Sequence, residues 1–267
     1  MEYQVLKPGA RLYPQKLRDR LGNEAPPLYY QGPLHLLDRF CLGVLSAFDF
    51  DTDAFWASNR LQFVLQEQHL NLIGPWLSPI ELVLFQMSFL YRNLTMTCFS
   101  SKGLAHESFE GFTADRYRPP VEGFDQQFIY RRQVEEGQVL MLSVTEPEES
   151  RRRTALIQKR NLAVCALSDL VFIPYAKPRT KTWETVKKVL ALLIPCFTSD
   201  DPSNARLHKL GVPGFNRKNL QKALESWGAP ADAPDPFPKD AAQVQPVEPK
   251  PPAKPEKKSE QLKLDWD

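Results

Sequence analysis

Residues 151–197 read RRRTALIQKRNLAVCALSDLVFIPYAKPRTKTWETVKKVLALLIPCF, and this stretch decides the fold class. Its apolar pattern predicts four alternating elements: a helix over 154–167, a strand over 170–174, a helix over 182–190 and a strand over 191–197. Strands that alternate with helices are typical of βαβ units, whose crossover connections place strands in parallel. The sequence therefore predicts an α/β fold with a Rossmann-like, mainly parallel sheet and flanking helices.

The chain before residue 151 repeats this alternation. Apolar runs predict strands over 40–45, 69–73, 94–99 and 138–144. Helices are expected between them over 54–67, 78–89 and 125–136. The expected caps are Thr52 or Asp53 for the first helix, Ser78 with Glu81 for the second, and Thr180 or Thr182 for the helix over 182–190. Residues 100–125 are polar and glycine-rich, which predicts an irregular loop.

The two ends of the chain differ from its middle. Residues 26–32 (PPLYYQG) contain two prolines that disfavour a helix, and Gly32 indicates a turn. We expect residues 1–36 to form an N-terminal segment that packs on a Rossmann-like domain over 37–227. Residues 228–267 are rich in Pro, Ala and Lys with little to bury, which predicts a disordered linker ending in a short linear motif.

The composition bounds the classes of function. Of 267 residues, 42% are hydrophobic and 25% charged, as in soluble globular proteins. The formal net charge is only +2, so affinity for nucleic acid has to come from local patches. The four cysteines are far apart and lie in apolar runs, which favours buried free thiols and a cytoplasmic location. We expect no metal, no other cofactor and no membrane span, because ligand clusters and long apolar runs are missing from the sequence.

Polar and basic residues follow the predicted strands and precede the predicted helices. In an open α/β sheet, loops at the carboxyl ends of strands bind ligands, and cations, hydroxyls and helix N–H groups suit phosphate. The predicted nucleic-acid contacts are Arg151, Arg152, Arg153, Lys159, Arg160, Asn161, Lys177, Arg179, Thr180, Lys181, Thr182, Ser203 and Asn204. A solvated helix start and an exposed basic loop are the alternatives. Trp76 and Trp183 are candidates for stacking on bases, although core packing is the commoner fate of an indole.

Several short strings occur in an order that resembles a known family. They are YPQKL (13–17), PPLYYQG (26–32), GQVLMLS (137–143), KRN (159–161) with ALS (166–168), DLVFI (169–173), IP (194–195), SN (203–204) and LGV (210–212). On these strings, which span about residues 11–215, the chain is identified as a divergent member of the DprA/Smf family, DNA-processing protein A. The resemblance implies a Rossmann-like protein of bacterial DNA processing and recombination that binds single-stranded DNA and assists RecA loading.

The sequence departs from the family pattern in the first loops. Leu45-Ser46-Ala47 replaces the family's G-S-R and is followed by Phe48-Asp49-Phe50-Asp51, so the first phosphate-contacting arginine is missing and two carboxylates are added. The family's glycine-rich S-G-x-A-x-G-I-D loop reads IGPWLSPIE over 73–81, and Leu162 replaces the second arginine of R-N-R. The later loops keep or add basic residues.

The residues give no sign of catalysis. Ser46, Ser78 and Ser143 have no matching nearby His and Asp. The phosphate-binding patterns GxGxxG and GxxxxGK[ST] are both absent from the sequence. We therefore expect no catalytic residues and a non-enzymatic single-stranded DNA-binding protein. The alternative is a degenerate Rossmann-like adaptor or nucleotide-sensing protein that has lost DNA binding.

The C-terminal tip has a pattern of its own. Gln261, Leu262, Leu264 and Trp266 resemble a Q-L-x-L-x-F peptide that binds the bacterial sliding clamp. An exposed tether of about thirty residues suits a weak peptide ligand. The alternatives are a frayed terminus and docking onto another partner. RecA, the sliding clamp and a second copy of the chain are thus the candidate protein partners.

Overall fold

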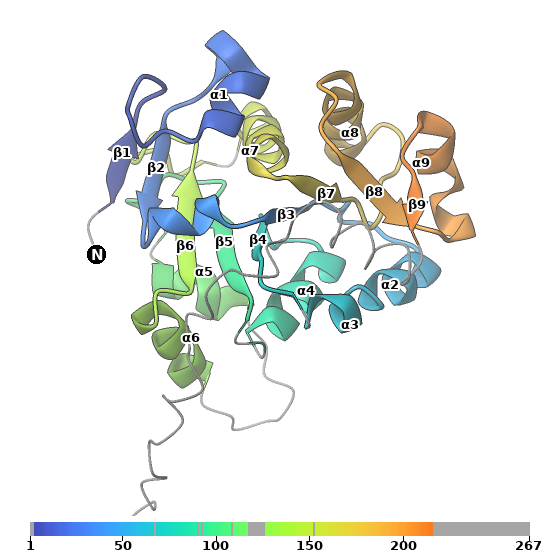
Figure 1. Ribbon diagram of the computed structural model, residues 1–267, viewed down its shortest axis with the longest axis horizontal. Helices are drawn as coiled ribbons and strands as arrows, with labels where there is room; N and C mark the ends of the chain where they lie inside the picture. Colours follow the sequence, from blue (N-terminus) through green and yellow to red (C-terminus); the bar gives the residue numbers. More distant parts are fainter. Residues whose placement is uncertain are drawn as a thin grey trace, which may run out of the picture. The chain divides into compact units, whose positions relative to one another are not determined.

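A nine-stranded sheet forms the centre of the computed structural model, which describes residues 3–66, 68–89, 91, 93–107, 109–116, 126–151 and 153–215 (Figure 1). The strands are β1 (Gln4–Leu6), β2 (Leu28–Gln31), β3 (Cys41–Val44), β4 (Asn71–Gly74), β5 (Thr95–Phe99), β6 (Val139–Ser143), β7 (Leu170–Phe172), β8 (Cys196–Ser199) and β9 (Gly214–Phe215). Their order across the sheet is β1-β2-β6-β5-β4-β3-β7-β8-β9. The predicted α/β fold with a mainly parallel sheet is confirmed.

The pairing of the strands creates one switch point. β3 pairs in parallel with β4 on one side and with β7 on the other. The chain runs outward from β3 through β4, β5 and β6, and then returns to β7. Among the described strands, only β1 with β2 and β2 with β6 pair antiparallel, at the edge of the sheet formed by the N-terminal strands. The crevice outside the carboxyl ends of β3 and β7 is therefore where a ligand site is expected in such a sheet.

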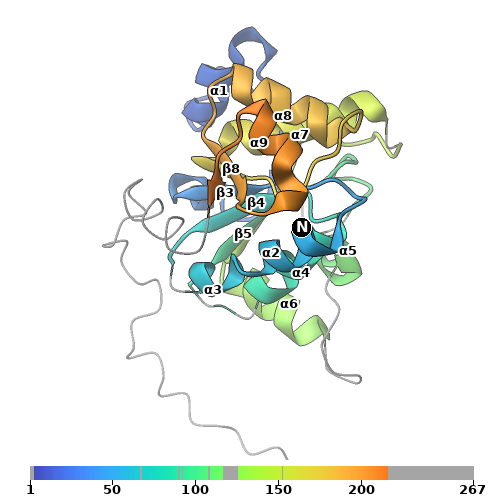
Figure 2. The ribbon, with the colours of Figure 1, turned by 90° about the vertical axis from the view of Figure 1, so that its right-hand side faces the viewer.

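Helices cover both faces of the sheet. They are α1 (Gln15–Leu21), α2 (Thr52–Asn59), α3 (Gln62–Leu65), α4 (Pro79–Ser88), α5 (Phe109–Arg116), α6 (Gln126–Glu135), α7 (Thr154–Leu167), α8 (Lys181–Ala191) and α9 (Ala205–Leu210). Three short 3-10 helices span Gly22–Glu24, Leu34–Asp38 and Pro202–Asn204. Figure 2 shows α1, α7 and α8 on one side of the sheet and α3 to α6 on the other.

Two apolar cores lie against the two faces of the sheet. Leu42, on one face of β3, belongs with Phe85 of α4 and Tyr130 of α6. Its neighbour Cys41 points to the other face and belongs with Leu17 of α1 and the apolar residues of α7. Successive strand residues point to opposite faces, and both faces are covered, so the strands read as continuous apolar runs rather than alternating ones.

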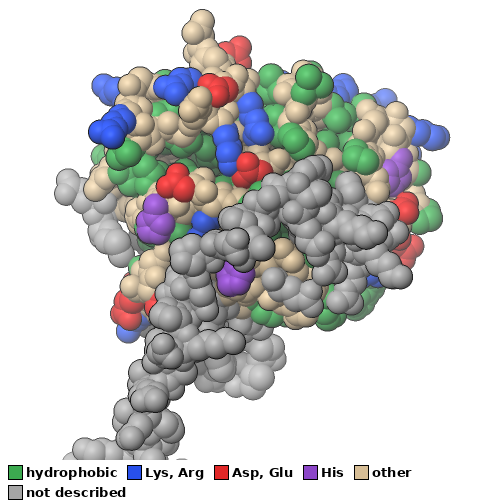
Figure 3. Space-filling view, viewed as in Figure 1, with side chains coloured by type: hydrophobic (Ala, Val, Ile, Leu, Met, Phe, Trp, Pro, Cys, Tyr) green, Lys and Arg blue, Asp and Glu red, His purple; other side chains and the backbone are tan. Residues whose placement is uncertain are grey.

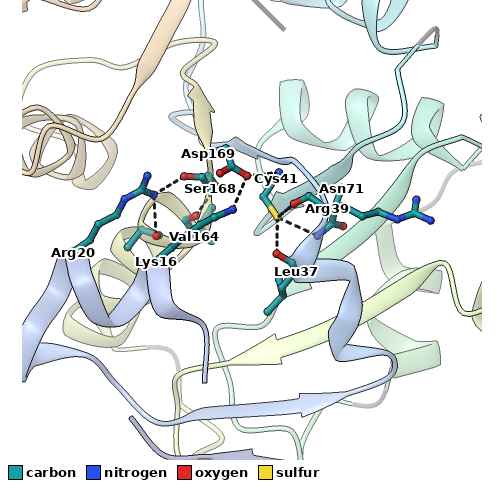
Figure 4. A network of polar contacts seen from close by, with 10 residues as sticks. Lys16, Arg20, Leu37, Arg39, Cys41, Asn71, Val164, Ser168 and Asp169 are labelled. Carbon is teal, nitrogen blue, oxygen red and sulfur yellow. Dashed lines mark hydrogen bonds and ion pairs between the residues drawn. The ribbon is translucent and has the colours of Figure 1, made fainter. Parts of the chain in front are cut away.

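The N-terminal helix is attached to the core by a polar network. Asp169 accepts hydrogen bonds from Lys16 Nζ at 2.6 Å and from the backbone N–H of Cys41 at 2.8 Å (Figure 4). Arg20 donates to the backbone carbonyls of Ala166 and Ser168, at the end of α7. One carboxylate therefore joins α1 to the beginning of β3, and one guanidinium satisfies carbonyls that the helix end leaves open.

One predicted helix and one predicted strand have wrong boundaries. The helix expected over 54–67 is divided into α2 and α3, and its N-cap is Asp51 rather than Thr52 or Asp53. The Asp51 carboxylate accepts the N–H of Asp53 at 2.9 Å. The strand expected over 191–197 begins only at Cys196, because α8 continues to Ala191 and a turn with Leu193 at φ 54° follows.

The loop expected over 100–125 contains a helix, so that prediction is wrong in part. α5 forms where Phe109 and Phe112 become buried in the core that also holds α4 and α6. Helix α9 was not expected either, and its Leu207 is fully buried. Both helices are short, so tertiary packing rather than local propensity stabilises them. The predicted linker over 228–267 lies outside the described residues.

All four cysteines are buried and free, as predicted. Burial raises the pKa of the Cys41 thiol to about 12 and that of Cys196 to about 11. Burial likewise raises the pKa values of Cys98 and Cys165. Because the thiolate is the reactive form, we expect the native protein at about pH 8 to react with a thiol reagent only slowly. Mass spectrometry should find four labelled thiols after unfolding in urea, and rapid labelling of the native protein would contradict the burial.

Candidate nucleic-acid interface

A pocket of about 250 Å³ opens at the switch point of the sheet. One wall is formed by residues 45–49, which follow β3. The loop after β4 and the start of α4 contribute Pro75, Leu77, Ser78 and Glu81. The remaining wall comes from the first turns of α7 and the start of α8, with Ile157, Arg160, Asn161, Thr180, Lys181 and Thr182. The pocket therefore lies where the topology predicts a ligand site.

Five of the predicted contact residues meet in this pocket. They are Arg160, Asn161, Thr180, Lys181 and Thr182. They come from two helices that are connected through β7, and the pairing of β7 with β3 brings both helix starts to the residues that follow β3. The parallel sheet is thus the physical reason that two separate basic segments of the sequence share one site.

The start of α8 is fixed by two threonines. Thr180 caps the helix, with Oγ1 accepting from the N–H of Trp183 at 3.2 Å and donating to the carbonyl of Lys177 at 2.6 Å. Thr182 is buried and donates to the carbonyl of Ser46 at 3.2 Å, across the pocket. Lys181 between them is exposed. The helix presents the positive end of its dipole at this position, and Lys181 adds a full charge.

Arg160 and Asn161 form the floor of the pocket rather than an open surface. Each is only 3% exposed. Arg160 donates from Nε and Nη2 to Asn161 Oδ1, at 3.1 and 2.7 Å. The guanidinium is therefore held in one orientation by its neighbour. Because the Arg160 side chain is buried, it contributes to the packing of the domain as well as to the pocket. The sequence pattern did not indicate this burial.

A buried carboxylate fills the other side of the pocket. Glu81 Oε1 accepts from the N–H of Ser46 at 2.7 Å, and Oε2 accepts from Leu77 and Ser78 at 2.8 and 3.0 Å. Burial raises the pKa of Glu81, opposed by these hydrogen bonds and by the charge of Arg160. Backbone N–H groups after a strand and at a helix start are the usual donors to a bound phosphate. Here the protein's own carboxylate already occupies three of them.

The other predicted cations lie outside the pocket. Arg151, Arg153, Lys159, Lys177 and Arg179 are exposed, and Arg152 lies outside the described residues. Arg153 pairs with Glu149 at 3.0 Å, which explains how a helix start tolerates cations against its dipole. On the face drawn in Figure 3, Lys and Arg side chains are interspersed with Asp and Glu rather than forming one basic field.

Ser203 and Asn204 have structural partners and do not line the pocket. Ser203 donates through Oγ and its N–H to Asp201 at 2.7 and 2.9 Å. Asn204 is buried and donates to the Pro174 carbonyl at 3.1 Å and to Ser199 Oγ at 2.8 Å. It joins the loops that follow β7 and β8.

The two tryptophans considered for stacking on bases, Trp76 and Trp183, differ in how deeply they are buried. Trp76 is fully buried, and its Nε1 donates to the Thr97 carbonyl at 3.2 Å. The interpretation that Trp76 stacks on a base is therefore wrong, because no base can reach a side chain inside the core. Trp183, on α8, is half-buried and packs against the core that contains residues of α7. The stacking hypothesis for Trp183 stays a prediction.

The predicted contact set did not include Ser46, Phe48, Ser78 and Glu81, which also line the pocket. They belong to the two loops that depart from the family pattern, and the sequence indicated Ser78 and Glu81 only as a helix cap. The described residues contain no group of three or more His, Cys, Asp or Glu that could hold a metal ion. Among those same residues, no helix combines the length and apolarity needed to cross a membrane.

Comparison with solved structures agrees with the fold. No family model and no curated protein sequence matches the chain. The structure of DNA processing protein A from Streptococcus pneumoniae matches with a TM-score of 0.63 at 16% identity, over 84% of this chain and 74% of that one. DNA processing protein A from Helicobacter pylori, whose structure describes a single-stranded DNA binding mode, matches with a TM-score of 0.61 at 17% identity, over 85% and 97%. The chain therefore has the fold of DNA processing protein A.

Proposed function

We propose that this protein binds single-stranded DNA, without catalysis, at the pocket between β3 and β7. The observation that carries the proposal is the meeting of Arg160, Lys181 and the N-terminus of α8 at the switch point of the sheet. The fold supports it, since the Helicobacter pylori protein of the same fold binds single-stranded DNA. The same likeness supports a DNA-processing role.

Charge decides which side of the pocket receives the phosphates. Asp49 and Glu81 lie on the side of β3 and α4, whereas Lys181 lies on the side of α8. Lys177 and Arg179 extend the cationic side, and in the described part of the chain neither they nor Lys181 form an ion pair with a carboxylate. A phosphate backbone that runs along residues 177–181 meets cations and a helix N-terminus, and avoids both carboxylates.

The proposal predicts a change in the salt dependence of DNA binding. Each phosphate contact on a single strand contributes about 0.7 to the slope of log affinity against log salt. Replacing Lys177, Arg179 and Lys181 together by glutamine should flatten this slope by about 2 and weaken binding at low salt. The measurement is fluorescence anisotropy with a labelled oligothymidylate over a salt series.

The matched control removes the same charge elsewhere. Lys187, Lys188 and Lys209 are also exposed, and their triple glutamine variant should keep the slope and most of the affinity. If both triple variants lose affinity equally, the effect comes from net charge and the site is wrong. If the parent protein binds neither single-stranded nor duplex DNA at low salt, the proposed function fails.

An adaptor or nucleotide-sensing protein is the second candidate. It is favoured by Glu81, which occupies backbone donors that would otherwise suit a phosphate. Against an enzyme, no histidine or cysteine lines the pocket within the described residues. RecA, a second copy of the chain and the sliding clamp remain proposed partners, and a cytoplasmic location remains a prediction. The residues of the predicted clamp-binding motif, Gln261, Leu262, Leu264 and Trp266, lie outside the described residues.

A further inference from the structure

A patch of exposed aromatic side chains follows β3, directly beside the pocket. Phe48 is 71% exposed and Trp56 is 63% exposed, although large apolar side chains are usually buried. Phe50 and Phe55 lie between them in the sequence and are partly exposed. We call these four residues the aromatic patch. Exposed apolar groups gathered in one place on a soluble protein mark a binding surface.

The aromatic patch is organised by the start of α2. The ring centroids of Phe50 and Phe55 are 5.5 Å apart, and those of Phe55 and Trp56 are 5.6 Å apart with an interplanar angle of 84°. The capping contact of Asp51 with the N–H of Asp53 fixes the turn into this helix. Phe48, at the other end of the patch, lines the pocket itself. Phe48 at the pocket wall is therefore followed within a few residues by the ring contacts at the start of α2.

The cationic residues 177–181 and the aromatic segment after β3 differ in chemistry in the same way as the phosphate edge and the base edge of a single nucleic-acid strand. Residues 177–181 offer cations and a helix N-terminus. The segment that follows β3 offers aromatic rings interleaved with the exposed Asp49, Asp51 and Asp53, which repel phosphate. Phe48 and Asp49 of this segment line the pocket itself. A nucleic-acid strand has phosphates along one edge and bases along the other. A strand in this crevice is thus oriented by charge, with its phosphates on α8 and its bases on the aromatic patch.

We propose that the aromatic patch is a base-stacking platform for single-stranded DNA, with Phe48 holding the base that lies at the pocket. This proposal rests on the single-stranded DNA binding proposed above. It adds the bases of the strand to the phosphates as groups that the protein recognises. Every base has an aromatic face, so such stacking tolerates any sequence. Duplex DNA hides these faces inside the helix, so the patch also favours single strands over duplex.

The test separates the contribution of the bases to binding affinity from that of the phosphates. We compare the affinity of the full-length protein for an oligothymidylate and for an abasic strand of the same length, which carries the same phosphates. One stacked base contributes roughly five- to hundredfold in affinity. The parent protein should therefore prefer the oligothymidylate by at least about fivefold. The Phe48→Ala/Trp56→Ala double variant should lose that preference and keep its affinity for the abasic strand.

Two variants serve as controls. Phe48→Trp should keep the preference, because it keeps an aromatic face. Phe128→Ala removes another exposed aromatic, on α6, and should leave both affinities unchanged. If the parent binds both strands equally, or if the double variant keeps the preference, the stacking platform is excluded while DNA binding stands. If the parent binds neither strand, the proposed function fails and the platform with it.

Discussion

Glu81→Ala is expected to lower the free energy of unfolding by about 3 kcal/mol, because it removes the acceptor of three backbone N–H groups. Each buried donor left without a partner costs about 1–3 kcal/mol, and water that enters the pocket offsets part of that sum. Ser46, Leu77 and Ser78 belong to the two loops that form the pocket wall. The loss should therefore loosen the site as well as the domain.

The isosteric variant Glu81→Gln separates size from charge. It fills the same space, but it replaces one acceptor oxygen by an amide donor that faces a backbone N–H, so a loss of about 1–3 kcal/mol is expected. Urea unfolding followed by circular dichroism measures both variants. Glu184→Ala is the control, because Glu184 is an exposed carboxylate whose removal should change the stability by less than about 0.5 kcal/mol.

The dependence of this effect on pH has a definite sign. Burial raises the pKa of Glu81 in the folded protein above its unfolded value. A carboxyl with a raised pKa stabilises the fold fully below its unfolded pKa, and that stabilisation is lost as the pH rises through the folded pKa. The stability difference between the parent and Glu81→Gln should therefore shrink from acid towards neutral pH. A difference that grows instead would mean that the three hydrogen bonds outweigh burial.

The elements predicted well from sequence carry their determinants locally. Helix α4 has Ser78 as its N-cap and Glu81 at the third helical position, and both halves of that capping box are present. Helix α7 spans the residues that its apolar pattern indicates, Thr154–Leu167. Helix α5 has no such signal, since Phe109 and Phe112 matter only once α4 and α6 are in place. Local chemistry is visible in a sequence, whereas burial against distant segments is not.

The same distinction applies to the site. Thr180 and Lys181 were predictable because residues after a parallel strand meet at one edge of the sheet. The burial of Arg160 was not predictable. An arginine in the first turns of a helix fits the same sequence pattern whether its side chain faces solvent or a pocket. Glu81 was recognised as a capping residue, and that role concealed its second partner, the N–H of Ser46. The exposed Phe48 appeared in the sequence only as a departure from a motif.

Trp76→Ala is expected to lower the free energy of unfolding by about 3–5 kcal/mol, as for other large aromatic side chains truncated in a core. The indole is fully buried, its centroid lies 5.7 Å from that of Phe85, and Nε1 donates to the Thr97 carbonyl. Its backbone has φ 55°, a left-handed conformation that disfavours side chains. The packed ring compensates that strain, and alanine would keep the strain without the packing.

Gly74 shows how closely the neighbouring backbone approaches this ring. A Cβ atom at residue 74 would lie 3.1 Å from three atoms of the Trp76 indole, so a side chain there would require the ring to shift by a few tenths of an ångström. Trp76→Phe keeps much of the apolar area and loses the hydrogen bond to Thr97, so it should cost less than alanine. Trp56→Ala, at the exposed tryptophan, should change the stability by less than about 0.5 kcal/mol. Urea titrations of the three variants give this order, and equal losses at residues 56 and 76 would contradict the assignment of Trp76 to the core and Trp56 to the surface.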